Sequence, residues 1–345
     1  MKRIFLLLVG AIMAGAISAQ VLDENESALI YYSPKTALTL DFIYTVEQFE
    51  RGQYAEYAEA MLGVSDVVME TASVYTLKDV HVGTTTTIDY ERPHKVVNDG
   101  AYPLLLTIND KGLLTGYNVH SFSKQMQKKE PECRHNEPKH APARVAPYPE
   151  DVLKAAHPEA QAMEIAKQIF HLRETRTYLL NGEVEHAPAD GEAMRMVLEE
   201  LNNQERALTE LFIGRKCMRT EHKTVRLEPN NAGEFLFFSD ENGFTDSENI
   251  DADTIEVRMD CQQQVAQPVD PKAKKKAQEL SQIVYNVPGY CTVNVLYKGN
   301  SLAKRAIPVA QLGIDVALPK KMFTGKDLPK ITFSEKTGNI VSISK

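Results

Sequence analysis

Apolar residues recur at three- and four-residue spacing in two neighbouring stretches of the chain, and this period predicts two amphipathic helices. The first helix is predicted to begin near Pro158, which suits a first turn, and to end at Asn181 and Gly182, which tolerate a left-handed C-terminal turn. Its apolar face should be buried. That face consists of Ala162, Ile165, Ala166, Ile169, Leu172 and Leu179.

The second helix is predicted to begin at Asp190, whose carboxylate can accept a free backbone N–H, and to end at Gly214. Its apolar stripe is Met194, Val197, Leu198, Leu201, Leu208, Leu211 and Phe212. Only residues 182–189 separate the two helices, so we expect them to pack side by side as an antiparallel hairpin.

One charged residue, Glu205, falls where the second stripe calls for an apolar side chain. It is either a carboxylate with a raised pKa that faces a cavity or a structural residue in an ion pair or at the edge of the stripe. The structural reading is favoured, because a buried carboxylate needs a partner and ion-pair networks are common. The same reading applies to the polar residues of the first helix, namely His171, Arg173, Glu174 and Arg176.

Before the helices, apolar and polar residues alternate with the period of two that is typical of half-buried strands. Strands are predicted at residues 30–32, 36–47, 73–90, 104–108 and 113–119, with a break at Pro34 and a tight turn at 109–112. A short helix is predicted from Tyr54 to about Gly63. Tyr54 and Tyr57 in it favour core packing over an aromatic binding surface.

After the helices the pattern returns to strands. Residues 216–227, 234–239 and 254–261 are interpreted as an antiparallel meander, followed by a helical turn at 273–283. Two more strands are predicted at 291–297 and 305–309, and a closing hairpin at 331–333 and 340–343.

These elements predict an α+β fold with two predominantly antiparallel β units connected by the amphipathic helical hairpin. The predicted divisions are a signal peptide at 1–19, an N-terminal β-rich domain with a short helix at 20–125, an exposed linker rich in Pro, His and Lys at 126–157, the helical hairpin at 158–214 and a C-terminal β-rich domain at 215–345. We expect the hairpin to brace the two β units.

The first residues favour export. Lys2 and Arg3 precede an apolar run that is short for a membrane span, and small residues precede Gln20. We therefore expect a signal peptide, an exported protein of the periplasm or outer surface, and no transmembrane segment once the signal is removed. The formal net charge of -8 becomes more negative when Lys2 and Arg3 are removed. An acidic chain disfavours nucleic acid as a partner.

The four cysteines are Cys133, Cys217, Cys261 and Cys291. They allow three connectivities, and disulfides persist in an oxidising compartment. Cys217 and Cys261 border strands of the expected meander and are the first guess for a pair, which would leave Cys133 and Cys291 free. Cys133 lies near His135 and His140 in the linker, but their spacing matches no structural zinc pattern, so a loop is the favoured reading.

Several stretches together resemble a known family, the secreted Bacteroidetes proteins grouped as domain of unknown function 4831. They span nearly the whole mature chain: Tyr31 to Thr36, Tyr54 to Gly63, Ile165 to Leu180, Pro188 to Gly191, Leu211 to Gly214, Val309 to Gly313 with Leu318 and Pro319, and Ile331 to Ile343. The resemblance supports export and implies no activity, ligand or catalytic residue. The linker, with Cys133 and its histidines, departs from the family's pattern.

The sequence names no catalytic, cofactor-binding or metal-binding residue and implies no cofactor, because it shows no nucleophilic, zinc-helix, phosphate-loop or calcium-loop motif. The leading hypothesis is a non-catalytic module that binds a protein or a cell-envelope component. This hypothesis is favoured over an enzyme. One alternative is an envelope hydrolase that uses two carboxylates from separate elements, although a chain without tryptophan is a poor candidate for sugar binding. Another is a structural subunit that assembles by edge-strand addition.

Overall fold

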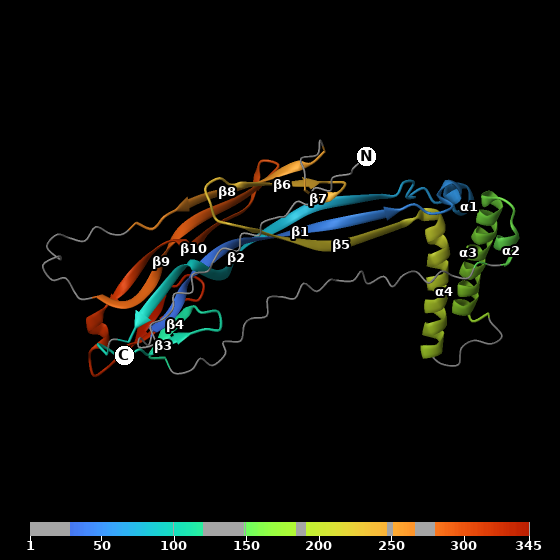
Figure 1. Ribbon diagram of the computed structural model, residues 1–345. Coiled ribbons are helices and arrows are strands. Elements are labelled where there is room, and N and C mark those ends of the chain that lie inside the picture. The colour runs from blue at the N-terminus through green and yellow to red at the C-terminus, as the bar shows by residue number, and fades with distance from the viewer. Residues whose placement is uncertain are drawn as a thin grey trace, which may run out of the picture.

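The structure, a computed structural model, describes residues 28–98, 100–119, 148, 150–183, 191–246, 251–265 and 280–344. The predicted signal peptide, most of the predicted linker with Cys133, His135 and His140, and the predicted capping residue Asp190 lie outside the described residues. The molecule is elongated, with two long strands along its length and the helices gathered at one end (Figure 1).

The long axis is formed by a three-stranded antiparallel sheet in the order β2-β1-β5. Its strands are β1 (Ala28–Glu50), β2 (Ala72–Val97) and β5 (Arg215–Leu227). The predicted break at Pro34 does not occur. Instead, the pairing of β1 with β2 shifts register between Tyr32 and Ser33, and the strand continues through the proline. A register shift is one of the places where a strand tolerates a residue without an N–H.

A second sheet packs against one part of this three-stranded sheet, which we call the ribbon. It has the order β10-β9-β8-β6-β7 and is also antiparallel. Its strands are β6 (Glu234–Ser239), β7 (Gly243–Thr245), β8 (Asp253–Gln262), β9 (Leu280–Tyr297) and β10 (Asn300–Pro319). The core between the two sheets is built from alternate residues of both, including Leu38, Leu40, Phe42, Phe238, Ile255, Val257, Val293, Val295 and Val309. Period-two alternation in residues 36–47 therefore identified the inward face of β1, with Leu38, Leu40 and Phe42, correctly.

A third, small sheet has the order β12-β11-β4-β3. It contains β3 (Leu106–Ile108), β4 (Leu114–Tyr117), β11 (Lys330–Phe333) and β12 (Ile340–Ser344), and the short 3-10 helix η3 (Lys320–Phe323) packs beside it. Its core includes Tyr31 and Val96 from the first sheet and Ile283 and Leu318 from the second. This sheet therefore holds the near ends of both large sheets together.

The helices pack at the opposite end. They are η1 (Ala55–Tyr57), α1 (Ala58–Leu62), α2 (Glu150–Lys154), α3 (Pro158–Asn181) and α4 (Gly191–Ile213). The predicted start and end of α3 are confirmed, and so is its buried stripe, in which all six predicted residues are buried. Tyr54 is only 2% exposed and packs in this core, as expected, with Tyr57 partly buried against it.

The second stripe is buried over only part of its predicted length. Leu208 and Phe212 are buried, whereas Val197 is 39% exposed. The reason is that a second packing layer, supplied by Tyr54 and Ala58 between β1 and β2, contacts the helices near the sheet end. Leu208 and Phe212 belong to this core, with Leu201 and Leu211 partly buried against it.

The α+β class is confirmed, but the arrangement of two β units joined by a bracing hairpin is not what the sheets show. β5, which follows the helices in sequence, pairs with β1, which precedes them, and β11 pairs with β4. Strands from both sides of the hairpin therefore share sheets. The helices cap one end of the ribbon because their apolar stripes pack on the β1–β2 connection.

The predicted meander is confirmed for its last two strands, since β6 and β8 pair antiparallel in the second sheet, but it is wrong for its first strand, because β5 belongs to the first sheet. The guessed pair of Cys217 and Cys261 depended on that meander and is also wrong. Cys261 on β8 instead forms a disulfide with Cys291, directly opposite on β9, and Cys217 is free. The predicted helical turn at 273–283 lies mainly outside the described residues, and its last residues, from Leu280, belong to β9.

Candidate functional site

A cleft with a volume of about 540 Å³ lies where the helices meet the ribbon. It is lined by side chains from α3, α4 and the first residues of β5. Charged residues of both signs dominate this lining, including Arg173, Glu205, Arg206, Glu210, Arg215 and Lys216.

Glu205 lies in this cleft as one partner of a double ion pair. Arg173 Nε donates to its Oε1 at 2.6 Å, and Arg176 donates to its Oε2. Burial raises the pKa of Glu205, but the hydrogen bonds from the two arginines outweigh that effect, so the pKa falls below its usual range. The structural interpretation of Glu205 is thus confirmed, and its lowered pKa is opposite to that of a general acid.

The other two carboxylates of the cleft also face cations. Asp66 accepts a contact of 3.0 Å from Lys216 Nζ, and Glu210 lies 4.0 Å from Arg206 Nε. Each of the three carboxylates that line this cleft therefore faces at least one cation.

We expect Glu205→Gln to lower the free energy of unfolding by about 1 kcal/mol, because two partly exposed arginines lose their shared carboxylate. Chemical denaturation of the purified protein measures this. The matched control is Glu174→Gln on the exposed side of α3, where the carboxylate accepts a hydrogen bond only from Tyr178 among the described contacts. An equal loss in both variants would contradict the role assigned to Glu205.

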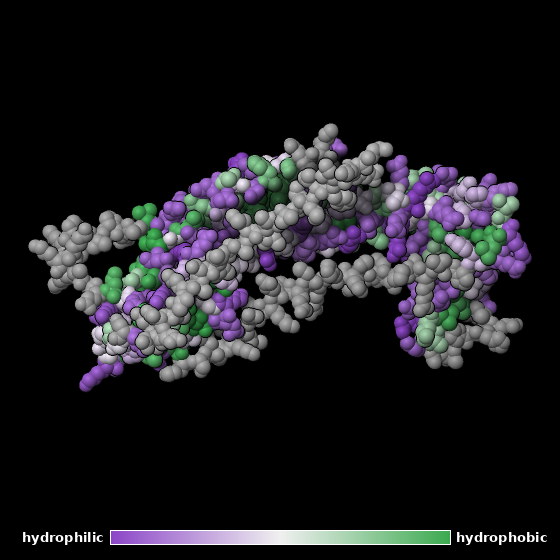
Figure 2. Space-filling model, in the orientation of Figure 1, coloured by the Kyte–Doolittle hydropathy of each residue, from purple (hydrophilic) through white to green (hydrophobic). Residues whose placement is uncertain are grey.

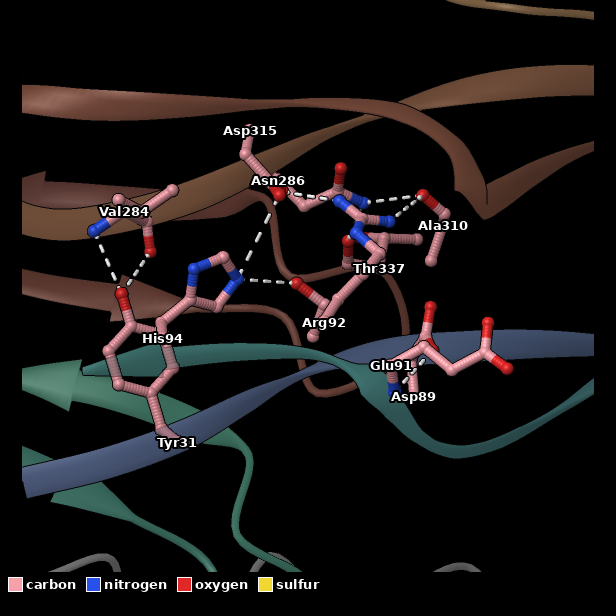
Figure 3. Close-up of polar contacts among 11 residues, drawn as sticks. Tyr31, Asp89, Glu91, Arg92, His94, Val284, Asn286, Ala310, Asp315 and Thr337 are labelled. Atoms are coloured by element: carbon pink, nitrogen blue, oxygen red, sulfur yellow. Dashed lines mark hydrogen bonds and ion pairs between the residues drawn. The ribbon is translucent and has the colours of Figure 1, made fainter. Parts of the chain in front are cut away.

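A second polar cluster joins the two large sheets near the small one (Figure 3). His94 on β2 lies in it with its Nε2 2.8 Å from Ser33 Oγ and 3.9 Å from Asp315 Oδ2. Arg92 forms an ion pair with the same aspartate. The residue types match a nucleophilic triad, but serine and aspartate approach the same ring nitrogen, whereas a triad needs them on opposite nitrogens.

The space beside this cluster is also too small for a substrate, with a volume of about 10 Å³. Its other contacts are structural. The hydroxyl of Tyr31 donates to the carbonyl of Val284 and accepts from its N–H, each at 2.8 Å. Asn286 Nδ2 donates to the carbonyls of Ala310 and Thr337 at 2.9 and 2.8 Å. The cluster therefore fastens the sheets to one another (Figure 3).

The environment of His94 makes stability depend on pH. Burial lowers the pKa of His94, the Arg92 charge lowers it further, and Asp315 opposes both. Because the unfolded chain then binds the proton more tightly than the folded protein, stability is retained above about pH 6.5 and is lost as pH falls below it. We expect the unfolding free energy measured between pH 7.5 and 5 to fall less steeply in His94→Gln than in the natural protein.

The control for this prediction is His171→Gln, since His171 is an exposed residue of α3. It should leave the slope unchanged. Identical pH profiles for the natural protein and His94→Gln would overturn the assignment.

The third feature is the free edge of the ribbon. β5 is hydrogen-bonded to β1 on one side, and no other strand among the described residues pairs with it on the other. The strand is rich in cations and contains one acid, Glu221. Its basic residues are Arg215, Lys216, Arg219, Lys223 and Arg226.

Some of these charges are already neutralised. Arg219 Nε contacts Glu221 at 2.5 Å, and Tyr44 donates to the same carboxylate at 2.8 Å. Burial and this hydrogen bond raise the pKa of Tyr44 to about 12. Lys223 and Arg226 are exposed and have no carboxylate partner among the described residues. The sequence prediction missed this surface because its charges are spaced along the strand and form no continuous run.

No group of three or more His, Cys, Asp or Glu side chains with the geometry to hold a metal ion occurs in the part of the chain that the structure describes. Of the helices in that part, none combines the length and the apolar character of a bilayer span.

Comparison with known proteins identifies the family to which the chain belongs. No curated protein and no solved structure matches it. One family model matches residues 27–341, a range that contains all the sheets and helices described above except the last residues of β12. The chain therefore belongs to the family described as domain of unknown function (DUF4831).

Proposed function

We propose that the protein is an exported, non-catalytic module that binds a protein or a cell-envelope component. The observation that carries this proposal is the edge of β5, a 13-residue strand whose outer side is open among the described residues. An open strand edge presents a row of backbone donors and acceptors that another chain can pair with.

The charged groups of the cleft support the same proposal. Each of its carboxylates faces a cation, and the pKa of Glu205 is lowered. The hydrolase alternative needs one protonated and one ionised carboxylate on either side of a scissile bond. The open edge favours a binding function over this chemistry.

Affinity capture tests the proposal. The mature protein, beginning at Gln20, is immobilised and exposed to envelope extract from cells that express it. Mass spectrometry of the retained material should show a component that is enriched over a column carrying heat-denatured protein. The same preparation is incubated with a panel of envelope polysaccharides. Turnover of any of them, together with no enriched component, would overturn the proposal in favour of the hydrolase.

Export is tested separately. We expect cell fractionation to find the protein outside the cytoplasm and its N-terminal residue to be Gln20, the residue after the small side chains of the predicted cleavage site. A cytoplasmic protein that retains Met1 would contradict this part of the proposal.

A further inference from the structure

We infer that the outer edge of β5 binds an extended, acidic segment of a partner protein, which adds to the ribbon as a further strand. This inference rests on the proposed binding function and names its surface and the chemistry of its partner.

The backbone of β5 supplies the first part of the argument. The strand pairs with β1 in one unbroken register from Arg215, opposite Glu50, to Leu227, opposite Leu38. Since successive residues of an antiparallel strand direct their N–H and C=O groups to alternate sides, about half of these groups point to the open side. A strand without a bulge along this length offers a regular template for pairing.

The side chains supply the second part. Lys216, Met218, Thr220, His222, Thr224 and Arg226 occupy one face of the strand, and all of them are exposed. In Figure 2, the surface along β5, below β1 in this view, is mainly hydrophilic. Because Lys223 and Arg226 have no carboxylate partner among the described residues, an incoming strand gains most from acidic side chains placed beside them.

The same charges argue against a second copy of this chain as the partner. If two β5 strands paired antiparallel about Glu221, Lys216 of one copy would face Arg226 of the other, and Arg219 would face Lys223. Glu221 would face itself. Like charges directly opposite each other destabilise a strand pair. The edge therefore disfavours self-association in this register and favours an acidic partner.

The place of the edge in the molecule suits an added strand. The cleft of about 540 Å³ opens beside the first residues of β5, where Arg215 and Lys216 contribute to its lining. A segment that runs along the edge can thus place one end near these two cations. Arg215 has no carboxylate partner among the described residues, whereas Lys216 contacts Asp66.

The probe for this inference is a fluorescently labelled peptide with the length of β5 and the repeat Thr-Glu-Glu, added to the mature protein. This repeat places glutamates on both faces of an added strand, as Lys223 and Arg226 on opposite faces of β5 require. We expect saturable binding, measured by fluorescence anisotropy, that weakens as salt is added. The double variant Lys223→Glu/Arg226→Glu should weaken binding about tenfold, because two attractive contacts become repulsive. Hydrogen exchange should slow at alternate amides of β5 when the peptide is bound.

Three controls make the result specific. The double variant Lys304→Glu/Lys330→Glu changes the net charge equally at exposed positions of β10 and β11, and it should bind the peptide as the natural protein does. A peptide in which every second residue is proline should not bind, since it lacks the N–H groups of a strand. Thermal unfolding should show that both variants remain folded.

Four outcomes would overturn the inference. They are no saturable binding, equal weakening in both charge variants, binding without slower exchange in β5, and a concentration-dependent dimer in sedimentation that the β5 variant abolishes. Salt-dependent binding without amide protection would indicate an acidic polymer held by side chains alone. If the β5 variant still retains the envelope component in affinity capture, the binding function stands and only its assignment to β5 fails.

Discussion

Replacement of both Cys261 and Cys291 by alanine is expected to lower the free energy of unfolding by about 3–4 kcal/mol. The disulfide joins strands β8 and β9 and closes a loop with a sequence separation of 30. A cross-link of this span removes conformational freedom mainly from the unfolded chain. Alanine avoids placing a hydroxyl in the core, where Cys291 is fully buried. Urea denaturation under non-reducing conditions measures the loss.

The free cysteine provides the control, since Cys217→Ala should leave stability nearly unchanged. A reducing agent should bring the natural protein close to the double variant and should not affect the double variant itself. If the natural protein unfolds at the same urea concentration with and without the reductant, the disulfide has no such role.

The second large effect is expected at Gly214, where Gly214→Ala should cost about 3 kcal/mol. The residue follows α4 and has a φ of 76°, a conformation that disfavours any side chain. A Cβ there would also lie 2.5 Å from the carbonyl oxygen of Glu50 and 2.8 Å from Cβ of Val68. Since one neighbour is the backbone of β1 and the other is the Cβ of the buried Val68, neither can move away easily, and the clash adds to the conformational cost.

Gly182 separates these two causes. It follows α3 with a φ of 73°, and a Cβ there would meet nothing within 4 Å. Gly182→Ala should therefore cost only about 1 kcal/mol, the conformational part alone. Denaturation of the two variants side by side gives the difference. Equal losses would mean that the close approach of Gly214 to β1 contributes nothing.

Local pattern predicted many of the elements, but it missed α2 in the predicted linker, where Val152 is buried, and the start of β9 at Leu280. The stripe of α3 could be identified because its residues meet one packing surface along nearly the whole helix, so period alone indicates which side is buried. The alternation around Leu38, Leu40 and Phe42 likewise indicates a face of β1 that covers a core. In both cases a single neighbouring layer decides burial.

The pairing of strands could not be predicted in the same way. The prediction assumed that strands adjacent in the sequence pair with each other. Instead β5, which follows α4, pairs with β1. The alternation in residues 215–227 indicates which side chains face inward, but it does not indicate which strand pairs with this one. Pairing with β1 and pairing with β6 therefore could not be distinguished from the sequence. The error in the cysteine pair followed from this choice.

The sequence predicted one of the candidate sites and missed the other two. Glu205 interrupted an apolar stripe, and such an interruption is visible in sequence, as are the arginines of α3 that pair with it. The cluster of Ser33, His94 and Asp315 joins three strands that are far apart in the chain, so no local pattern indicates it. The basic edge of β5 was missed because its significance depends on which side of the strand is open.

The pairing of β1 with β5 has a consequence for how the chain reaches its native state. Tyr44 and Glu221 are 177 positions apart, yet their strands must meet before the ribbon is complete. Contacts between such distant positions require closure of a long loop, which slows folding. Until residue 227 is available, β1 lacks its native partner on one side and can pair with another chain. A protein truncated before Arg215 is therefore expected to aggregate.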